Sequence, residues 1–409
     1  MNAGMWRGLL CAALFVAAAA NVLAQTPPAE PPTRADALRI ARDAKQKSIK
    51  PYTPNALERA MRVAEERVFP LNARDGVHLK FGSITTGSGF AYGGGYRNRQ
   101  LFDREGAFSV WAAGSLKKYW AVEGRFDFPD LAGGKFLVGT YARRHSYPQE
   151  SFFGIGPDSR RGDETTFSIE NTLVGGAIGV RPARVLTFSG GVEYSTPRIG
   201  QGSRRNVPPA SALFDPASAP GLVGSHDYLR TTAGVEVDYR QPKNARRGGW
   251  YRLDFSNVHD DSGAHGFRRV DVDLRQYASV LSERRVFAVR LFMSTSTTGA
   301  GESVPFYLMP SLGGHDSLRG FRDYRFRGPH ALLTQSEYRF EIWSGLDGAL
   351  FYDAGKVGLR RRDLNFKRLE DAYGFGFRFN TDNGVILRID AGFGSSDGKH
   401  LYIVFGDVF

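Results

Sequence analysis

Cysteine is almost absent from this 409-residue chain. The one cysteine, Cys11, lies within residues 1–24, which have the pattern of a secretory signal: Arg7, a short apolar run over Leu9–Ala20, and the small-residue cleavage site Val22-Leu23-Ala24. The alternative, a retained anchor, is disfavoured because a membrane-spanning helix needs about 20 apolar residues. Removal of this signal would leave no thiol, which excludes disulfides and cysteine-bound metals.

Long hydrophobic runs are also missing. After the signal, no segment reaches 18 consecutive apolar residues, so the sequence predicts no transmembrane helix. The mean hydropathy is −0.33, although the chain has 30 Phe, 17 Tyr and 49 Gly. A transmembrane β-barrel combines these properties, because only every second strand residue faces lipid. The net charge of +12 would also suit nucleic-acid binding, but export makes that partner improbable.

Familiar enzyme motifs are the third absence. The sequence contains no His-Glu-x-x-His, P-loop or nucleophile-elbow motif. His259, Asp260, Asp261 and His265 crowd one predicted loop and resemble an outer-membrane protease site. Such residues in a polar loop are far more often solvated. We therefore predict no catalytic residue, no metal site and no cofactor.

The segment 25–75 has its own character. A Pro-rich spacer over residues 25–32 precedes two predicted short helices, 33–47 and 53–68, each with an apolar side at helical spacing. This side could pack on a partner, plug a barrel, or form a small satellite under a barrel rim. We expect the segment to lie in the periplasm.

From residue 76 to residue 409 the hydrophobic period changes to two. Apolar and polar residues alternate in four clear stretches: 125–128, 235–240, 337–342 and 374–379. A soluble sandwich gives similar strings, so the two chain ends must decide. They favour an all-β, transmembrane antiparallel barrel of roughly 14–18 strands, with 16 as the central value. Two stretches, Gly200–Ser225 and Ser294–Ser303, are predicted loops.

The last predicted strand, Lys399–Phe409, ends on an aromatic residue. Leu401, Ile403, Phe405 and Phe409 fall on one face of it. A terminal aromatic on such a strand is the usual signal by which outer-membrane barrels are recognised for assembly, and Phe405 and Phe409 would carry it here. The alternative is an ordinary edge strand that ends on Phe by chance. With the export signal, this end predicts a bacterial outer-membrane location, with lipid and the barrel assembly machinery as partners.

Several motifs together resemble a known family. The chain contains, in order, Phe152-Phe153-Gly154-Ile155-Gly156, Leu312-Gly313-Gly314 with Leu318-Arg319-Gly320-Phe321, Glu337-Tyr338-Arg339-Phe340, and Phe351-Tyr352-Asp353-Ala354-Gly355. This order resembles the bacterial surface antigen family, whose superfamily contains outer-membrane protein assembly factors and two-partner secretion translocators. The resemblance covers about residues 76–409. The segment 25–75 is too short for the periplasmic polypeptide-transport-associated domains of that superfamily, which suggests a barrel-only member.

The resemblance implies a lumenal latch. In the family, the Arg-Gly-Phe tip belongs to a long extracellular loop that folds back into the lumen, where its arginine meets acids of the barrel wall. Here these residues are Arg319, Gly320 and Phe321, with Asp353 and Glu337 as partners. Strand parity supports this independently, because both acids alternate with apolar neighbours that would face lipid. The alternative is a solvated loop cation, the commonest fate of an arginine.

Function is expected from the same resemblance. It implies insertion or translocation of polypeptide, or of lipid, at the outer membrane, through a barrel seam that offers its strand edges. The rival interpretation is a passive pore or structural barrel. A third is that the protein works only with a separate periplasmic helper that docks on the N-terminal helices.

Overall fold

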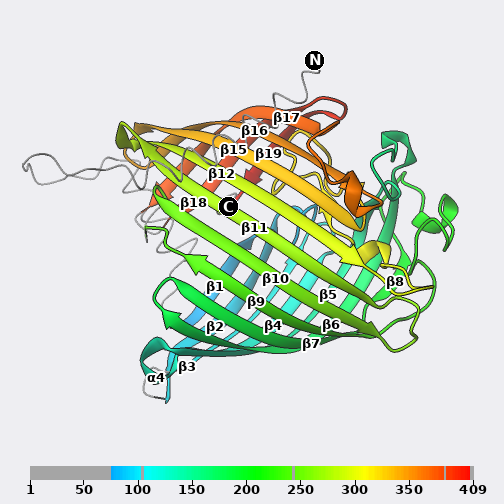
Figure 1. The fold of residues 1–409 in the computed structure, drawn as a ribbon, viewed down its shortest axis with the longest axis horizontal. Helices are drawn as coiled ribbons and strands as arrows, with labels where there is room; N and C mark the ends of the chain where they lie inside the picture. Colours follow the sequence, from blue (N-terminus) through cyan, green and yellow to red (C-terminus); the bar gives the residue numbers. More distant parts are fainter. Residues whose placement is uncertain (1–74, 103–105, 242–244, 382–383, 406–409) are drawn as a thin grey trace, which may run out of the picture.

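The protein is a nearly closed β-barrel of 16 antiparallel strands (Figure 1). The computed structural model describes residues 75–102, 106–241, 245–381 and 384–405. The two predicted N-terminal helices and Phe409 lie outside these residues. Within them, no helix has the length and apolar character needed to cross a membrane. The predicted fold class and strand number are therefore confirmed.

Each barrel strand pairs antiparallel with the next barrel strand along the chain. The first eight barrel strands are β1 (Gly76–Gly82), β2 (Ala91–Leu101), β3 (Gly106–Ser115), β4 (Trp120–Asp130), β5 (Phe136–Phe152), β6 (Thr165–Ala183), β7 (Leu186–Ser195) and β9 (Tyr228–Asp238). The other eight are β10 (Gly248–Asp260), β11 (Phe267–Val280), β12 (Ser282–Thr297), β15 (His330–Trp343), β16 (Leu346–Gly358), β17 (Glu370–Thr381), β18 (Gly384–Gly394) and β19 (Gly398–Val404).

Short elements complete the described chain. Strand β8 (Arg198–Gln201) extends the sheet beside β6, and β13 (Ser311–Leu312) pairs with β14 (Phe326–Arg327) in a separate ribbon. The helical turns are α4 (Leu131–Gly134), η3 (Arg161–Asp163), η4 (Ala210–Ala212), η5 (Phe306–Leu308) and η6 (Arg361–Asp363).

The period-two pattern sorts side chains between the outer wall and the lumen. On β16, Leu350 is 53% exposed on the outer wall, whereas its neighbours Phe351 and Asp353 are buried inside. On β15, Ile342 is exposed outside and Glu337 is buried inside. Alternation in the sequence thus gave the correct side of the wall for both predicted acids.

The two ends of the barrel carry connections of different length. At one end the turns are short, as at 184–185, Leu281 and 344–345. At the other end lie the long loops 196–227, 298–329 and 359–369, the first of which includes β8 and η4. Outer-membrane barrels place short turns in the periplasm and long loops outside the cell. This rule assigns the long-loop end to the exterior.

One predicted loop begins later than expected. The sequence predicts a loop over Ser294–Ser303, but Ser294 to Thr297 form the end of β12 and pair with β11. Thr295 and Thr297 are β-branched and suit a strand. Beyond the hydrocarbon layer a strand needs no apolar outer face, so polar composition did not mark the boundary there. The predicted loop Gly200–Ser225 is largely correct, since only Gly200 and Gln201 belong to β8.

The barrel is nearly closed where its first and last strands approach each other. Both β1 and β19 have only seven residues. A Cβ added to Gly82, the last residue of β1, would lie 3.5 Å from the ring of Phe405, just after β19. The two edges are therefore neighbours, and we call this junction the seam.

Candidate functional site

The loop 298–329 turns back into the barrel, and its tip is fixed by apolar contacts and tight turns. Gly313 and Gly314 both have positive φ, which lets the chain reverse after β13. Phe321 is fully buried, and its ring meets Phe326 at 5.3 Å between centroids. The apolar cluster beneath the tip consists of Leu312, Leu318, Phe321, Phe326, Ala331, Leu333, Val357 and Ala372.

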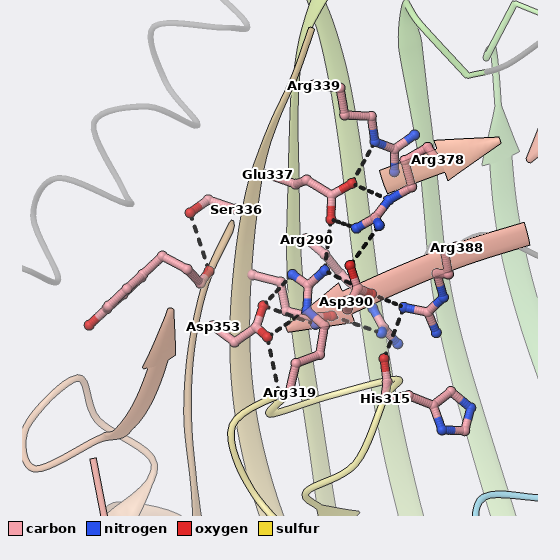
Figure 2. Close-up of polar contacts among 12 residues, drawn as sticks. Arg290, His315, Arg319, Ser336, Glu337, Arg339, Asp353, Arg378, Arg388 and Asp390 are labelled. Carbon is pink, nitrogen blue, oxygen red and sulfur yellow. Dashed lines mark hydrogen bonds and ion pairs between the residues drawn. The ribbon is translucent and has the colours of Figure 1, made fainter. Parts of the chain in front are cut away.

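Arg319 lies at the centre of the loop tip and reaches both predicted acids (Figure 2). Its Nε and Nη2 donate to the two carboxylate oxygens of Asp353, each at 2.8 Å. Its Nη1 donates to Oε2 of Glu337 at 2.7 Å, and its backbone N–H also donates to Asp353. A fork of this kind gives geometric specificity as well as strength. We call Arg319, Glu337 and Asp353 the latch.

The latch is completely removed from solvent. All three of its side chains have 0% exposure, and the guanidinium carbon of Arg319 lies 3.5 Å from the centre of the Phe351 ring. Burial alone would lower the pKa of the Arg319 guanidinium, but Asp353 outweighs it, with help from Glu337 and Asp390, and raises that pKa above its ordinary value. Arg319 is therefore a permanent cation.

The latch belongs to a wider network on the lumenal face. Glu337 also accepts from Arg378 at 2.7 Å and from Arg339 at 2.7 Å. Arg378 continues to Asp390 at 2.6 Å, which in turn accepts from Arg388 at 3.2 Å. Strands β15, β17 and β18 thus share one chain of alternating charges (Figure 2). Buried charges are tolerated when paired in this way.

Gly320 is required by close backbone packing. A Cβ at Gly320 would lie 2.3 Å from the backbone nitrogen of Gly394 and 2.5 Å from its Cα. A Cβ at Gly392 would lie 2.0 Å from the carbonyl oxygen of Arg319. The loop tip therefore lies backbone against backbone on β18, and only glycines permit this approach. This packing brings the Arg319 side chain to the wall acids.

Sequence reasoning missed several members of the network, although their signal was present. Arg339 and Arg378 lie on the lumenal side of the alternating stretches 337–342 and 374–379. Asp390 lies on the lumenal side of β18. The parity that selected Glu337 and Asp353 applied equally to them. The family resemblance covers only its own motifs. Strand parity alone also places these other charged residues on the inner face. The family motif contains Phe351, but it did not identify this residue as the ring that contacts Arg319.

The predicted assembly signal is only partly visible. Leu401 and Ile403 are 68% and 62% exposed on the outer wall of β19, as expected for its lipid face. Phe405 lies at the seam, and Phe409 is outside the described residues. Its recognition by an assembly machine stays a prediction.

In the cluster that resembles a protease site, Asp260 and His265 make hydrogen bonds within the loops. Asp260 accepts from the Ser262 hydroxyl, and from the backbone N–H groups of Ala264 at 3.1 Å and His265 at 3.0 Å, which closes the turn after β10. The His265 ring lies within hydrogen-bond distance of Ser303. Within the described residues, no group of three or more His, Cys, Asp or Glu is arranged to hold a metal.

The opposite half of the lumen is open. A cavity of about 840 Å³ is bordered by strands β4 to β7 and β9 to β11 near the short-turn end. Its charges form half-exposed pairs, such as Arg252 with Glu236 at 3.4 Å and with Asp254 at 2.6 Å. The wall there carries several ion pairs, including Arg125 with Asp127 at 2.7 Å.

Comparisons with known proteins agree with this architecture. The Omp85 superfamily domain matches residues 243–399, which include the loop and every residue of the latch. The chain carries an Omp85 superfamily domain. This match agrees with the predicted superfamily, and together with the barrel it indicates an outer-membrane protein. No curated protein matches it in sequence.

Solved structures show the same fold at low identity. The chain is similar to BamA from Haemophilus ducreyi lacking POTRA domains 1–3, with 14% identity and a TM-score of 0.61 over 81% of this chain and 70% of that one. It is also similar to CdiB from Acinetobacter baumannii (13%, TM-score 0.50) and from Escherichia coli (14%, TM-score 0.54). Each CdiB match covers 81% of this chain but only 59% and 62% of the CdiB chains.

Proposed function

We propose that this outer-membrane protein inserts or translocates polypeptide, with the loop 298–329 as a latched plug and the seam as the working edge. The loop, fixed by the buried latch, is the observation that carries the proposal. A direct route along the lumen is obstructed on the β15–β18 side, whereas β1 and β19 are short strands that meet at the seam. A short strand edge can offer its backbone hydrogen bonds to an incoming strand. Membership of the Omp85 superfamily supports this activity.

A passive pore is the second candidate, and one observation favours it. The cavity bordered by β4–β7 and β9–β11 leaves part of the lumen unfilled at the short-turn end. If this space continued past the loop, water and ions would cross. A pore would then need no movement of the latch, so the two candidates differ in what the latch does.

Single-channel recording in planar bilayers tests the choice. We expect low, flickering conductance from the parent protein, and larger, longer openings from R319A, because the plug loses its buried anchor. R252Q removes a half-exposed cation of the open half and should conduct like the parent. Steady, large, ion-selective conductance from the parent, unchanged in R319A, would contradict the proposal and favour the pore.

We propose further that residues 1–24 are removed on export and that the periplasmic segment 25–75 receives a helper protein or polypeptide substrate. We assign the protein no catalytic role. Terminal sequencing of the protein recovered from outer membranes should give Gln25 as its first residue. Crosslinking from the segment 33–68 should capture a periplasmic protein, and the absence of any captured species would argue against a helper.

A further inference from the structure

The loop between β16 and β17 has an unusual concentration of unpaired positive charge. Its five exposed cations form no ion pair with any described residue, in contrast to the arginines of the lumen, most of which are paired. The nearest acids in sequence have other partners: Asp363 accepts from the backbone N–H of Arg360 at 2.9 Å, and Glu370 from the Ser396 hydroxyl at 3.0 Å. The five are Arg360, Arg361, Arg362, Lys367 and Arg368.

The loop lies at the level of the outer-leaflet headgroups. It shares the long-loop end of the barrel with the loop 298–329, since β16 returns from the short turn at 344–345. On the outer wall just below it, Tyr373 is 64% exposed and pairs across strands with Tyr352. Tyrosines of this kind mark the membrane interface of a barrel. Glu370, where β17 begins, is three residues further, or about 10 Å along the strand.

The same loop also exposes apolar surface. Leu359 is 56% exposed and Phe366 is 39% exposed, and both lie beside the cations in sequence. A segment that mixes arginine or lysine with leucine and phenylalanine suits the boundary between headgroups and acyl chains. Neither nucleic acid nor an acidic soluble protein would need the apolar pair.

We propose that the basic loop, residues 359–369, binds phosphate-bearing glycolipid headgroups of the outer leaflet. Four of its five cations are arginines, whose planar fork matches two phosphate oxygens at once. Clusters of this size bind anionic membrane surfaces mainly through summed electrostatic attraction. Leu359 and Phe366 contact the upper acyl chains. The bound lipid fixes the barrel in the outer leaflet on the β16–β17 side, where the loop tip lies against the inner face of the wall.

The architecture of the loop allows a clean test, because its backbone does not depend on the five cationic side chains. Lys356 donates to the side chain of Asn365 at 3.2 Å and to the carbonyl of Lys367 at 2.9 Å. Helical turn η6 is closed by Asp363. Replacement of the cationic groups by glutamine therefore removes charge and leaves these contacts in place.

The experiment measures binding of bisphosphorylated lipid A to the full-length protein in detergent, by native mass spectrometry. We expect R360Q/R361Q/R362Q/K367Q/R368Q to weaken the apparent Kd at least about tenfold. A variant with all four arginines changed to lysine keeps the charge and should lose less affinity, since only the planar fork of each guanidinium is removed. The control neutralises five exposed cations at the short-turn end and should stay within about twofold of the parent: Lys135, Arg184, Arg247, Arg284 and Arg285.

The competition experiments distinguish a lipid headgroup from free phosphate, and the control variant distinguishes the basic loop from a general effect of charge. Phosphatidylcholine should not compete, millimolar inorganic phosphate should compete weakly, and added salt should weaken binding because the site is exposed. Equal affinity in the loop variant and the parent would overturn the proposal, as would an equal loss in the control variant. Full displacement by inorganic phosphate would assign the loop to free phosphate instead. Heat-modifiable migration on gels verifies that every variant is folded.

Discussion

The two halves of the lumen are made from the same kind of sequence but differ in burial. On β10 and β9, Arg252 and Glu236 form a pair whose side chains are 42% and 32% exposed. On the loop and β16, Arg319 and Asp353 form a pair in which both are 0% exposed. Both pairs lie on the inner face of the wall. The difference is the loop 298–329, which covers one half of the lumen and leaves the other to water.

This difference decides what each pair contributes. An exposed ion pair is typically worth about 0–1 kcal/mol, because water solvates the charges almost as well as their partners do. A buried pair is costly to form, but removal of one member costs about 3–5 kcal/mol, because a bare charge is left behind. Strands in the two halves can therefore carry similar charges, but only the buried pairs of the covered half stabilise the docked loop.

The largest expected effect comes from the latch. R319A should destabilise the docked loop by about 3–5 kcal/mol. Within the described residues Asp353 has no other ion pair, whereas Glu337 keeps Arg339 and Arg378. Limited proteolysis should therefore cut the loop much faster in R319A than in the parent. Thermal unfolding of R319A in detergent should begin at a lower temperature.

A second substitution tests which acid is left without a partner. D353A added to R319A should restore much of the lost protection, and E337Q added to R319A should restore less. Equal rescue by both would mean that Arg319 serves the two acids alike. A protease pattern identical to that of the parent in R319A would show that the loop is held by its apolar contacts alone.

The next effect concerns the close approach of the loop to β18. G320A should cost about 1–3 kcal/mol, the usual range for overpacking, since the new methyl group would overlap the backbone of Gly394. Gly124 on β4 is the matched control, because a Cβ there meets nothing within 4 Å. Differential scanning calorimetry of both variants should show a lowered unfolding temperature in G320A only. Similar losses in the two would assign the effect to strand glycines in general.

Much of the fold could be predicted from the sequence, because a barrel is defined locally. Alternation of the kind seen at Glu337 and Tyr338 reports which side of the wall a residue faces, and it needs no knowledge of the partner strand. Boundaries outside the membrane were harder, as at Ser294. There the outer face of a strand has no lipid to match, so a polar strand and a polar loop look alike.

The latch could be predicted only in part. Parity and the family resemblance placed Arg319, Glu337 and Asp353 on the inner face, but neither could show that Gly320 packs on the backbone of Gly394. That contact joins residues 74 positions apart through a loop that must first turn into the barrel. The pairing of Arg378 with both Glu337 and Asp390 likewise depends on strand register, which single-sequence patterns do not set.

Replacement of Asp323, a carboxylate in the covered half, should change the free energy of unfolding by a smaller amount. Burial raises the pKa of the Asp323 carboxyl in the loop, and its Oδ1 has no hydrogen-bond partner among the described residues. An acid with a raised folded pKa disfavours folding above that pKa, and the penalty disappears below the unfolded pKa. D323N should therefore stabilise the protein by about 1 kcal/mol near neutral pH. Melting curves should converge with those of the parent in acid, and a constant offset at all pH values would exclude titration as the cause.

The smallest effect should come from the open half, where R252Q removes one member of a half-exposed pair. We expect less than about 1 kcal/mol, because water replaces the lost partner around Glu236 and Asp254. The same change should become smaller still at high salt, which screens exposed charges but hardly affects the latch. Chemical unfolding of R252Q and R319A at low and high salt measures both. If R252Q were as damaging as R319A, water would not reach the open half, and burial by the loop could not be what separates the two halves.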